Sequence, residues 1–417
     1  MRILVISNFY PPHFIGGYEL GCRDVVDALR RRGHDVRVLT SMHGVDRPEQ
    51  SGHVHRWLET DLGLKIDDPA ADWRRVIKKE AINRQAFDRL CRSFTPDLVY
   101  VWNATYVSIS VAIRAQRMGL KVCYFISDHW LTQWESDALY SLSRRTPRRL
   151  HRKLAWRLLM SWLHANGTLT RDELDLRRVQ FASRFLKQAA LDAGRPVADA
   201  EVIHWGIDLE RFPFNEAARR PVRLLYVGQL TALKGVHTAI EALKKIRENP
   251  LHAEATLTVA GGPDYDDRLH QLAASLGVGP FVHFTGLLPR EQLPAIYRAH
   301  DLLIFPSAWD EPFSITLLEA MACGLAVVGT NTGGSAEILR DKANALIFAK
   351  EDSNRCAEQV SRLLRDAALF ERLRREGRRT VEERFRLDHM VDHIERELRK
   401  HAGAGEPLKT AAAGERR

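Results

Sequence analysis

The sequence predicts an α/β protein built from two Rossmann-like domains, and three observations carry that prediction. In each half of the chain, short apolar runs alternate with segments of helical periodicity, the pattern of βαβ units with a parallel sheet. The 417 residues are enough for two domains of ordinary size, each with its own core. A composition of 45% hydrophobic and 28% charged residues is typical of globular proteins, and no apolar run approaches the roughly 18 residues of a spanning helix.

The first half opens with an apolar run that turns sharply, so we interpret it as a β-strand and not as a signal peptide. An amphipathic helix is expected from Tyr18 to Arg32, and Gly33 in the C′ position ends it. The strands predicted for this half lie at residues 2–7, 34–40, 97–103 and 121–127.

The second half repeats the alternation of strand and helix. A helix is expected over residues 236–249, and the segment 206–221, with two prolines and little periodicity, is the predicted linker. The strands predicted for this half lie at 223–230, 255–262, 281–286, 302–307 and 325–330. The domains therefore span 1–205 and 206–384, a further helix is expected at about 385–400, and the low-complexity tail 401–417 is expected to be disordered.

The cysteine spacing and the net charge limit which compartment and which partners fit this chain. Five widely spaced cysteines without a CxxC pair argue against a disulfide framework and a zinc site, and predict buried thiols in a reducing cytoplasm. The net charge of +9 favours an anionic partner, but nucleic acid, an acidic membrane surface and phosphorylated substrates all fit.

Glycine pairs stand before two of the predicted helices. Gly16 and Gly17 precede the first helix, whose N-terminus carries about half a positive charge and suits a phosphate, although a structural turn fits equally well. With Gly21 they do not make a GxGxxG fingerprint, and the chain has no Walker A sequence, which counts against a dehydrogenase and an NTPase.

Charged residues gather in the loops of the second half. Lys234 opens a helix after the first strand of that half, where it could neutralise a diphosphate or lie solvated on the surface. Glu311 follows a strand in a loop, and a helix begins near Ser314, a residue suited to N-capping, with Glu319 in its second turn. The next strand ends before the pair Gly333–Gly334. Because loops at the carboxyl ends of parallel strands meet at one edge, we expect both acids in one ligand site.

These residues lead to a family. Glu311 and Glu319, with seven residues between them, resemble the E-x7-E signature of retaining glycosyltransferases of the GT-B architecture, and the run 311–339 looks like glycosyltransferase family 4. The resemblance covers nearly the whole chain and is strongest over 223–346. It implies two Rossmann-like domains that face each other across a cleft, with a C-terminal helix crossing back to the first domain.

The resemblance also implies roles in binding a nucleotide-sugar donor. It assigns Glu319 to the donor ribose and Glu311 to the hydroxyls of the transferred sugar near the anomeric carbon. Lys234 would hold the diphosphate, and the backbone amides of Gly16–Gly17 and Ser314–Ile315 would assist. Glu311 and Lys234 are thus the candidate catalytic residues of the second domain.

Further candidates follow from the same resemblance. Gly333 and Gly334 belong to the donor neighbourhood, and His129 lies after a strand where the family often has a histidine touching the donor sugar, with Asp128 as a weaker candidate. An unrelated core histidine would look the same. The chain departs from the family at Gln229, where an arginine is usual. Either another basic residue compensates, with Arg184 as our candidate, or helix dipoles carry more of the phosphate charge.

The resemblance implies transfer of a hexose from a UDP- or GDP-linked sugar with retained configuration. The departing phosphate oxygen accepts the proton of the acceptor, and the resemblance implies no cofactor or metal. The expected acceptor is a lipid-linked, envelope or exopolysaccharide glycan. The sequence leaves the base, the sugar and the acceptor open.

Residues 143–163 form a predicted basic amphipathic helix with tryptophans. It would either lie on an anionic membrane, making a cytoplasmic protein peripherally membrane-associated, or dock on the first domain. Nucleic acid is not expected, because no reading motif accompanies it. An epimerase-like enzyme or a non-catalytic nucleotide-sugar-binding protein would share the fold but leave the E-x7-E block unexplained, and a glycosidase would leave the diphosphate-type loops unexplained.

Overall fold

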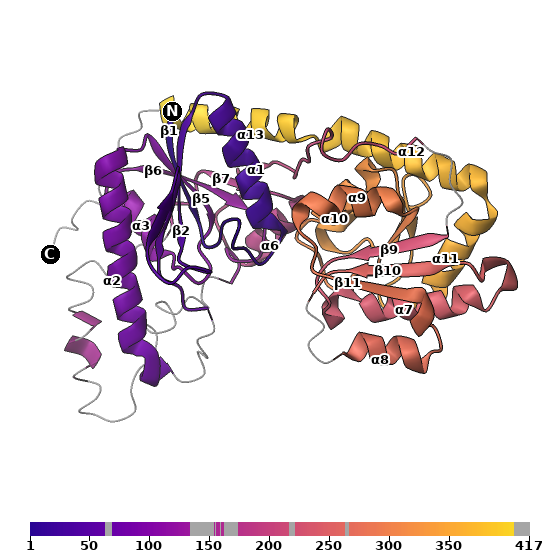
Figure 1. Ribbon diagram of the computed structural model, residues 1–417. Helices are drawn as coiled ribbons and strands as arrows, with labels where there is room; N and C mark the ends of the chain where they lie inside the picture. The colour runs from indigo at the N-terminus through magenta and orange to yellow at the C-terminus, as the bar shows by residue number, and fades with distance from the viewer. Residues whose placement is uncertain are drawn as a thin grey trace. The chain divides into compact units, whose positions relative to one another are not determined.

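A computed structural model describes residues 1–62, 69–133, 174–216, 222–262 and 267–403, with a few more between 154 and 161. The chain divides into two compact units. The first contains Met1–Ala182, Leu186–Ile203 and the chain from Val391 onward, and the second contains Ser183–Phe185 and His204–Met390. Each unit is an α/β layer structure around one sheet (Figure 1), so the predicted fold class is confirmed.

The first unit is built on a sheet with the strand order β3-β4-β2-β1-β5-β6-β7-β8. Neighbouring strands are parallel except β3, which pairs antiparallel with β4. Its strands are β1 (Arg2–Ser7), β2 (Asp35–Ser41), β3 (Glu49–Ser51), β4 (Val54–Leu58), β5 (Leu98–Asn103), β6 (Lys121–Ile126), β7 (Val179–Phe181) and β8 (Glu201–Val202). Its helices include α1 (Gly17–Arg31), α2 (Pro69–Phe94), α3 (Ser110–Arg117) and most of α6 (Arg184–Asp192). All residues of β5 are buried, as expected for a central parallel strand covered on both faces.

The second unit has a fully parallel sheet with the order β11-β10-β9-β12-β13-β14. Its strands are β9 (Arg223–Val227), β10 (Thr256–Ala260), β11 (Val282–Gly286), β12 (Leu302–Phe305), β13 (Ala326–Gly329) and β14 (Leu346–Ile347). Its α-helices are α7 (Val236–Arg247), α8 (Arg268–Ser275), α9 (Leu293–Ala299), α10 (Ile315–Ala322), α11 (Ser353–Arg365) and α12 (Ala367–Arg384). Short 3-10 helices include η2 (Ala232–Lys234) and η6 (Gly333–Glu337).

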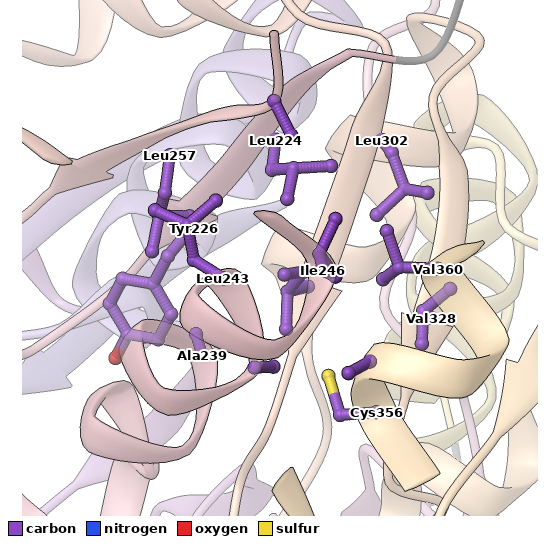
Figure 2. Packing of buried hydrophobic residues seen from close by; sticks show 14 of the residues in the cluster. Leu224, Tyr226, Ala239, Leu243, Ile246, Leu257, Leu302, Val328, Cys356 and Val360 are labelled. Atoms are coloured by element: carbon purple, nitrogen blue, oxygen red, sulfur yellow. The ribbon is translucent and has the colours of Figure 1, made fainter. Parts of the chain in front are cut away.

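The core of the second unit joins its sheet to helices α7 and α11. Side chains from β9, β10, β12 and β13 meet Leu243 and Ile246 of α7 and Val360 of α11 (Figure 2). Every one of the three helical side chains is fully buried. The 3.6-residue periodicity of 236–249, which predicted the helix, follows from this packing.

The predicted linker at 206–221 needs a correction, because its described part packs into the second unit. Ile207 is buried and forms a β-bridge with Arg386, and Phe212 is also buried. A Cβ atom at Gly206 would lie 2.2 Å from the backbone oxygen of Arg386, so glycine permits this close approach. The two prolines predicted an irregular backbone. The described part of the segment is irregular, but it packs into the second unit.

Helix α13 (Leu387–Gly403) joins the two units. Its first four residues belong to the second unit, and the helix from Val391 onward belongs to the first. The predicted tail begins too early, because His401–Gly403 continue this helix; residues 404–417 lie outside the described residues.

Two further expectations concern cysteines and the membrane. All five cysteines are free and buried, as predicted. Within the described residues, no helix combines the length and apolarity needed to cross a bilayer. The basic segment 143–163 lies almost entirely outside the described residues.

Candidate active site

The carboxyl ends of three neighbouring strands build the candidate site in the second unit. β9, β12 and β13 are adjacent in the sheet, so the loops after them come together. The loop after β9 leads into η2 and carries Lys234, and the loop after β12 carries Glu311 and leads into α10. The loop after β13 leads into η6 at Gly333.

Lys234 and Glu311 form the ion pair at the centre of this region. The Lys234 Nζ atom lies 2.8 Å from each carboxylate oxygen of Glu311. The Glu311 side chain is 6% exposed and that of Lys234 is 22% exposed. Ser307 Oγ donates a second hydrogen bond, of 2.7 Å, to Glu311 Oε1. A nearly buried carboxylate is thus compensated by one cation and one hydroxyl.

Backbone contacts fix the two loops against each other. The amides of Ala308 and Trp309 both donate to the Leu233 oxygen, at 2.9 and 3.1 Å. The Lys234 ammonium lies 4.8 Å from the centre of the Trp309 ring, within the range of a cation–π interaction. Because the loops are tied on both sides of Lys234, its ammonium is held in position before any ligand arrives.

Gly333 and Gly334 pack closely against the backbone of the loop that carries Glu311. A Cβ atom at Gly334 would lie 2.2 Å from the Pro312 oxygen, and one at Gly333 would lie 2.5 Å from the Glu311 oxygen. The Gly334 amide donates to that Glu311 oxygen at 2.6 Å. The expectation from sequence was that these glycines open a helix toward the donor; the structure shows that their missing side chains admit the backbone beside Glu311.

Glu319 has a partner of its own. It is the fifth residue of α10, is 5% exposed, and accepts a 2.9 Å hydrogen bond from the Tyr297 hydroxyl of α9. Tyr297 is fully buried. The two acids of the E-x7-E block therefore lie on one loop-and-helix segment, each held by a different side chain.

Ser314, Ile315 and Gln229, which the sequence also predicted for the site, lie in or beside the same loops. Ser314 occupies the N-cap position of α10, and Ile315 is its first helical residue, but the Ser314 side chain makes no capping hydrogen bond. Gln229 is exposed, and its backbone oxygen accepts from the Tyr226 hydroxyl at 2.7 Å. The expected capping by Ser314 is therefore wrong in its side-chain detail.

In the first unit, the Gly16–Gly17 turn starts α1, and Gly16 is its N-cap. The carboxylate of Glu19, which is fully buried, accepts from the amides of Ile15 at 3.2 Å and Gly16 at 3.0 Å. These are donors that the end of a helix leaves unsatisfied, and here the chain's own acid takes them. A phosphate that uses the Gly16 amide has to replace Glu19 there.

Asp128 and His129 follow β6 at the carboxyl edge of the first sheet. Asp128 accepts from Asn103 Nδ2 at 2.5 Å and from the Trp130 amide at 3.0 Å. Burial raises the pKa of Asp128 to about 6, and the charge of Glu19 adds to the rise. The His129 backbone oxygen accepts from the Thr132 hydroxyl at 2.8 Å.

Arg184 contacts Glu337 through its backbone amide, whereas a substitute for the missing cation would act through its guanidinium group. Its backbone amide donates to Glu337 Oε2 at 3.1 Å, and the Phe185 amide donates to Glu337 Oε1 at 2.9 Å. None of these contacts involves Gln229 or Lys234. Within the described ranges, no group of three or more potential metal ligands is found.

Comparisons with known proteins decide the family. Residues 208–380 match the glycosyl transferases group 1, and residues 15–211 match glycosyltransferase family 4. Glycogen synthase of Mycobacterium tuberculosis is 30% identical over 92% of this chain and 91% of its own length. The chain belongs to the GT-B glycosyltransferases.

Solved structures agree with this glycosyltransferase fold. Sucrose-phosphate synthase from Thermosynechococcus elongatus superposes with a TM-score of 0.72 at 19% identity, over 96% of this chain and 98% of that one. HepE of Anabaena, solved in complex with UDP-glucose, gives a TM-score of 0.69 at 19% identity, over 96% of this chain and 100% of that one.

Sequence reasoning missed several residues that shape this glycosyltransferase site. Ser307 and Trp309 stand in the loop that was singled out, so their proximity to Glu311 could have been inferred from it. Tyr297 lies 22 residues before Glu319, and Glu19 was hidden within the first helix. Nothing in the sequence pattern distinguishes these two from ordinary helix residues.

Proposed function

We propose that this chain is a retaining hexosyltransferase that moves a hexose from a UDP- or GDP-linked donor to an acceptor hydroxyl. The observation that carries the proposal is the Lys234–Glu311 pair, because it joins the loop after β9 to the first acid of the E-x7-E block. An epimerase-like enzyme or a non-catalytic binder gives no reason for a cation aimed at that acid.

In the proposed mechanism, the donor diphosphate replaces Glu311 as the partner of the Lys234 ammonium. Glu311 keeps its Oε1 atom anchored by Ser307 at 2.7 Å, which leaves Oε2 available to a hydroxyl of the transferred sugar. Glu319, oriented by Tyr297, accepts from the ribose. The roles of Gly16, Gly17 and His129, which belong to the first unit, stay predictions.

The transfer step breaks the bond between the anomeric carbon and the diphosphate oxygen. A bond to the acceptor oxygen forms on the same face, and the proton of the acceptor passes to the departing phosphate oxygen. Lys234 stabilises the charge that gathers on the leaving group, an effect of about 3 kcal/mol for a well-placed donor. The proposal needs no metal and no cofactor.

The proposed acceptor is a lipid-linked, envelope or exopolysaccharide glycan, reached from the cytoplasm with peripheral contact of 143–163 to anionic lipid. The similarity to glycogen synthase supports including a glucan among the acceptors tested. HepE was solved with UDP-glucose, which makes that donor the first to test.

The first test is a thermal-shift panel of UDP, GDP, ADP and their common sugar conjugates in the presence of a chelator. A ligand at a hundredfold excess over its Kd should stabilise the fold by about 2.7 kcal/mol. The sugar conjugate that stabilises it is then offered with acceptors, and NMR of the product reports the anomeric configuration. An inverted product, or conversion of the donor sugar without any acceptor, would contradict the proposal.

A further inference from the structure

Three arginines gather around Glu337 in the second unit, outside the contacts that serve the proposed transfer reaction. The backbone amide of Arg184 donates to Glu337 Oε2 at 3.1 Å, and Arg384 Nη2 donates to the Glu337 backbone oxygen at 3.1 Å. Arg340 follows Glu337 by three residues in the chain. All three side chains are exposed, and all three residues belong to the second unit.

The charge of this arginine cluster (Arg184, Arg340 and Arg384) is poorly compensated. The Glu337 carboxylate already accepts from two backbone amides and, at 2.7 Å, from His204 Nε2. In the part of the chain that the structure describes, the guanidinium groups of Arg184 and Arg340 make no hydrogen bond or ion pair. Burial, and after it the charges of Arg340 and Arg184, lower the pKa of Arg384, although the charge of Glu337 opposes them; both neighbouring arginines therefore act on Arg384.

An anion would relieve this repulsion. The planar fork of a guanidinium donates two parallel hydrogen bonds to a phosphate, and several arginines around one point are a recurring way to hold that group. We propose that Arg184, Arg340 and Arg384 form a binding site for a phosphate-bearing ligand, separate from the donor site at Lys234. The proposal does not depend on the transferase activity.

The test is calorimetric titration of the full chain with inorganic pyrophosphate. The double variant Arg184→Gln/Arg340→Gln removes two guanidinium groups that make no hydrogen bond or ion pair among the described residues. Its matched control is Arg31→Gln/Arg396→Gln, which removes the same charge from two exposed arginines of the first unit that likewise make no side-chain contact in the described structure. Lys234→Ala separates this site from the donor site.

We expect the Arg184→Gln/Arg340→Gln variant to bind pyrophosphate at least about tenfold more weakly than the control, with binding retained in Lys234→Ala. Equal affinity in the double variant and its control, or loss of all binding in Lys234→Ala, would overturn the proposal. Sedimentation with phosphatidylglycerol vesicles, against phosphatidylcholine vesicles, distinguishes the source of the phosphate. Weaker sedimentation of the double variant than of its control would identify a lipid headgroup; equal sedimentation with weaker pyrophosphate binding would identify a free phosphate compound.

Discussion

The charge balance of the second unit's site depends on the side chain of Lys234. Its ammonium is the cation on a Glu311 carboxylate that is only 6% exposed. Lys234→Ala leaves that acid uncompensated, so we expect the free energy of unfolding to fall by about 3 kcal/mol. If the proposed role is right, turnover at saturating donor falls as well. Urea unfolding and initial rates measure the two effects.

The neighbouring Lys350–Asp310 pair supplies the control for that variant. Its N–O distance is also 2.8 Å, but its side chains are 41% and 54% exposed. Lys350→Ala should cost less than about 1 kcal/mol, because an exposed pair contributes little. Equal losses in the two variants would mean that the burial of Glu311 has no energetic consequence.

Asp128 gives the first unit a pH dependence. Its pKa is raised from 3.8 to about 6 by burial, so the folded state favours the neutral carboxyl. This stabilisation is complete below about pH 4 and is lost as the pH rises through 6, by about 3 kcal/mol. Asp128→Asn should remove that decline, which urea unfolding between pH 4 and 7 would reveal.

Asp97 supplies a control of opposite sign. A hydrogen bond from the Arg2 amide, helped by the Arg2 side chain, lowers the pKa of Asp97. Its stabilisation is therefore present above about pH 4 and is lost only as the pH falls through the lowered pKa, so Asp97→Asn should destabilise the chain equally at pH 7 and pH 5, and less at about pH 2. Parallel pH profiles for the two variants would refute the assignment to Asp128.

The sequence predicts those residues of this site that lie in a loop following a strand. Lys234 and Glu311 stand directly after strands, and the topology of a parallel sheet brings such loops together. Tyr297 could not be found in this way, because its hydroxyl reaches Glu319 from a different helix. Such a pairing depends on how α9 and α10 pack.

At the scale of elements, the pair Gly333–Gly334 determines where the loop that carries Glu311 can lie. Gly334→Ala would place a methyl group 2.2 Å from the Pro312 oxygen, so the loop that carries Glu311 has to shift. We expect a loss of about 1–3 kcal/mol in the free energy of unfolding. Weaker nucleotide binding should accompany it, and calorimetry measures that.

Gly279→Ala is the matched substitution in the same unit. The nearest atom to its new methyl group lies 3.7 Å away, an ordinary contact, so stability should change by less than about 0.5 kcal/mol. A wild-type affinity and stability in Gly334→Ala would show that the loop accommodates the methyl group without moving Glu311.

Most of the longer strands were predicted from the sequence, but the five-residue strand β4 and the shortest strands were not. β1, β5, β9 and β12 are buried apolar runs, so hydrophobicity alone marks them. β3, β8 and β14 contain two or three residues at sheet edges, too few for any periodicity. Their pairing is set by the neighbouring strand.

At the scale of the whole molecule, the C-terminal helix α13 contributes to the same unit as the N-terminal strand β1. Ile394 of α13 is fully buried and belongs to the first unit, 387 residues after the end of β1 in sequence. Ile394→Ala should lower the free energy of unfolding by about 2–5 kcal/mol through the cavity it leaves. If the units unfold in separate transitions, that of the first unit should shift.

Arg396→Ala, on the exposed face of the same helix, should change stability by less than about 0.5 kcal/mol. A denaturation curve of Ile394→Ala that coincides with that of the control would show that α13 contributes little to the first unit.

The division of the chain into units has a practical consequence for fragments. The backbone passes from one unit to the other four times, after Ala182, Phe185, Ile203 and Met390. A fragment of residues 204–390 would lack Ser183, whose hydroxyl donates to the Pro312 oxygen at 2.6 Å, and the amides that satisfy Glu337. A fragment of the second unit therefore needs these three residues restored; without them the Glu337 carboxylate loses two backbone donors and keeps only His204 as a hydrogen-bond partner among those described above.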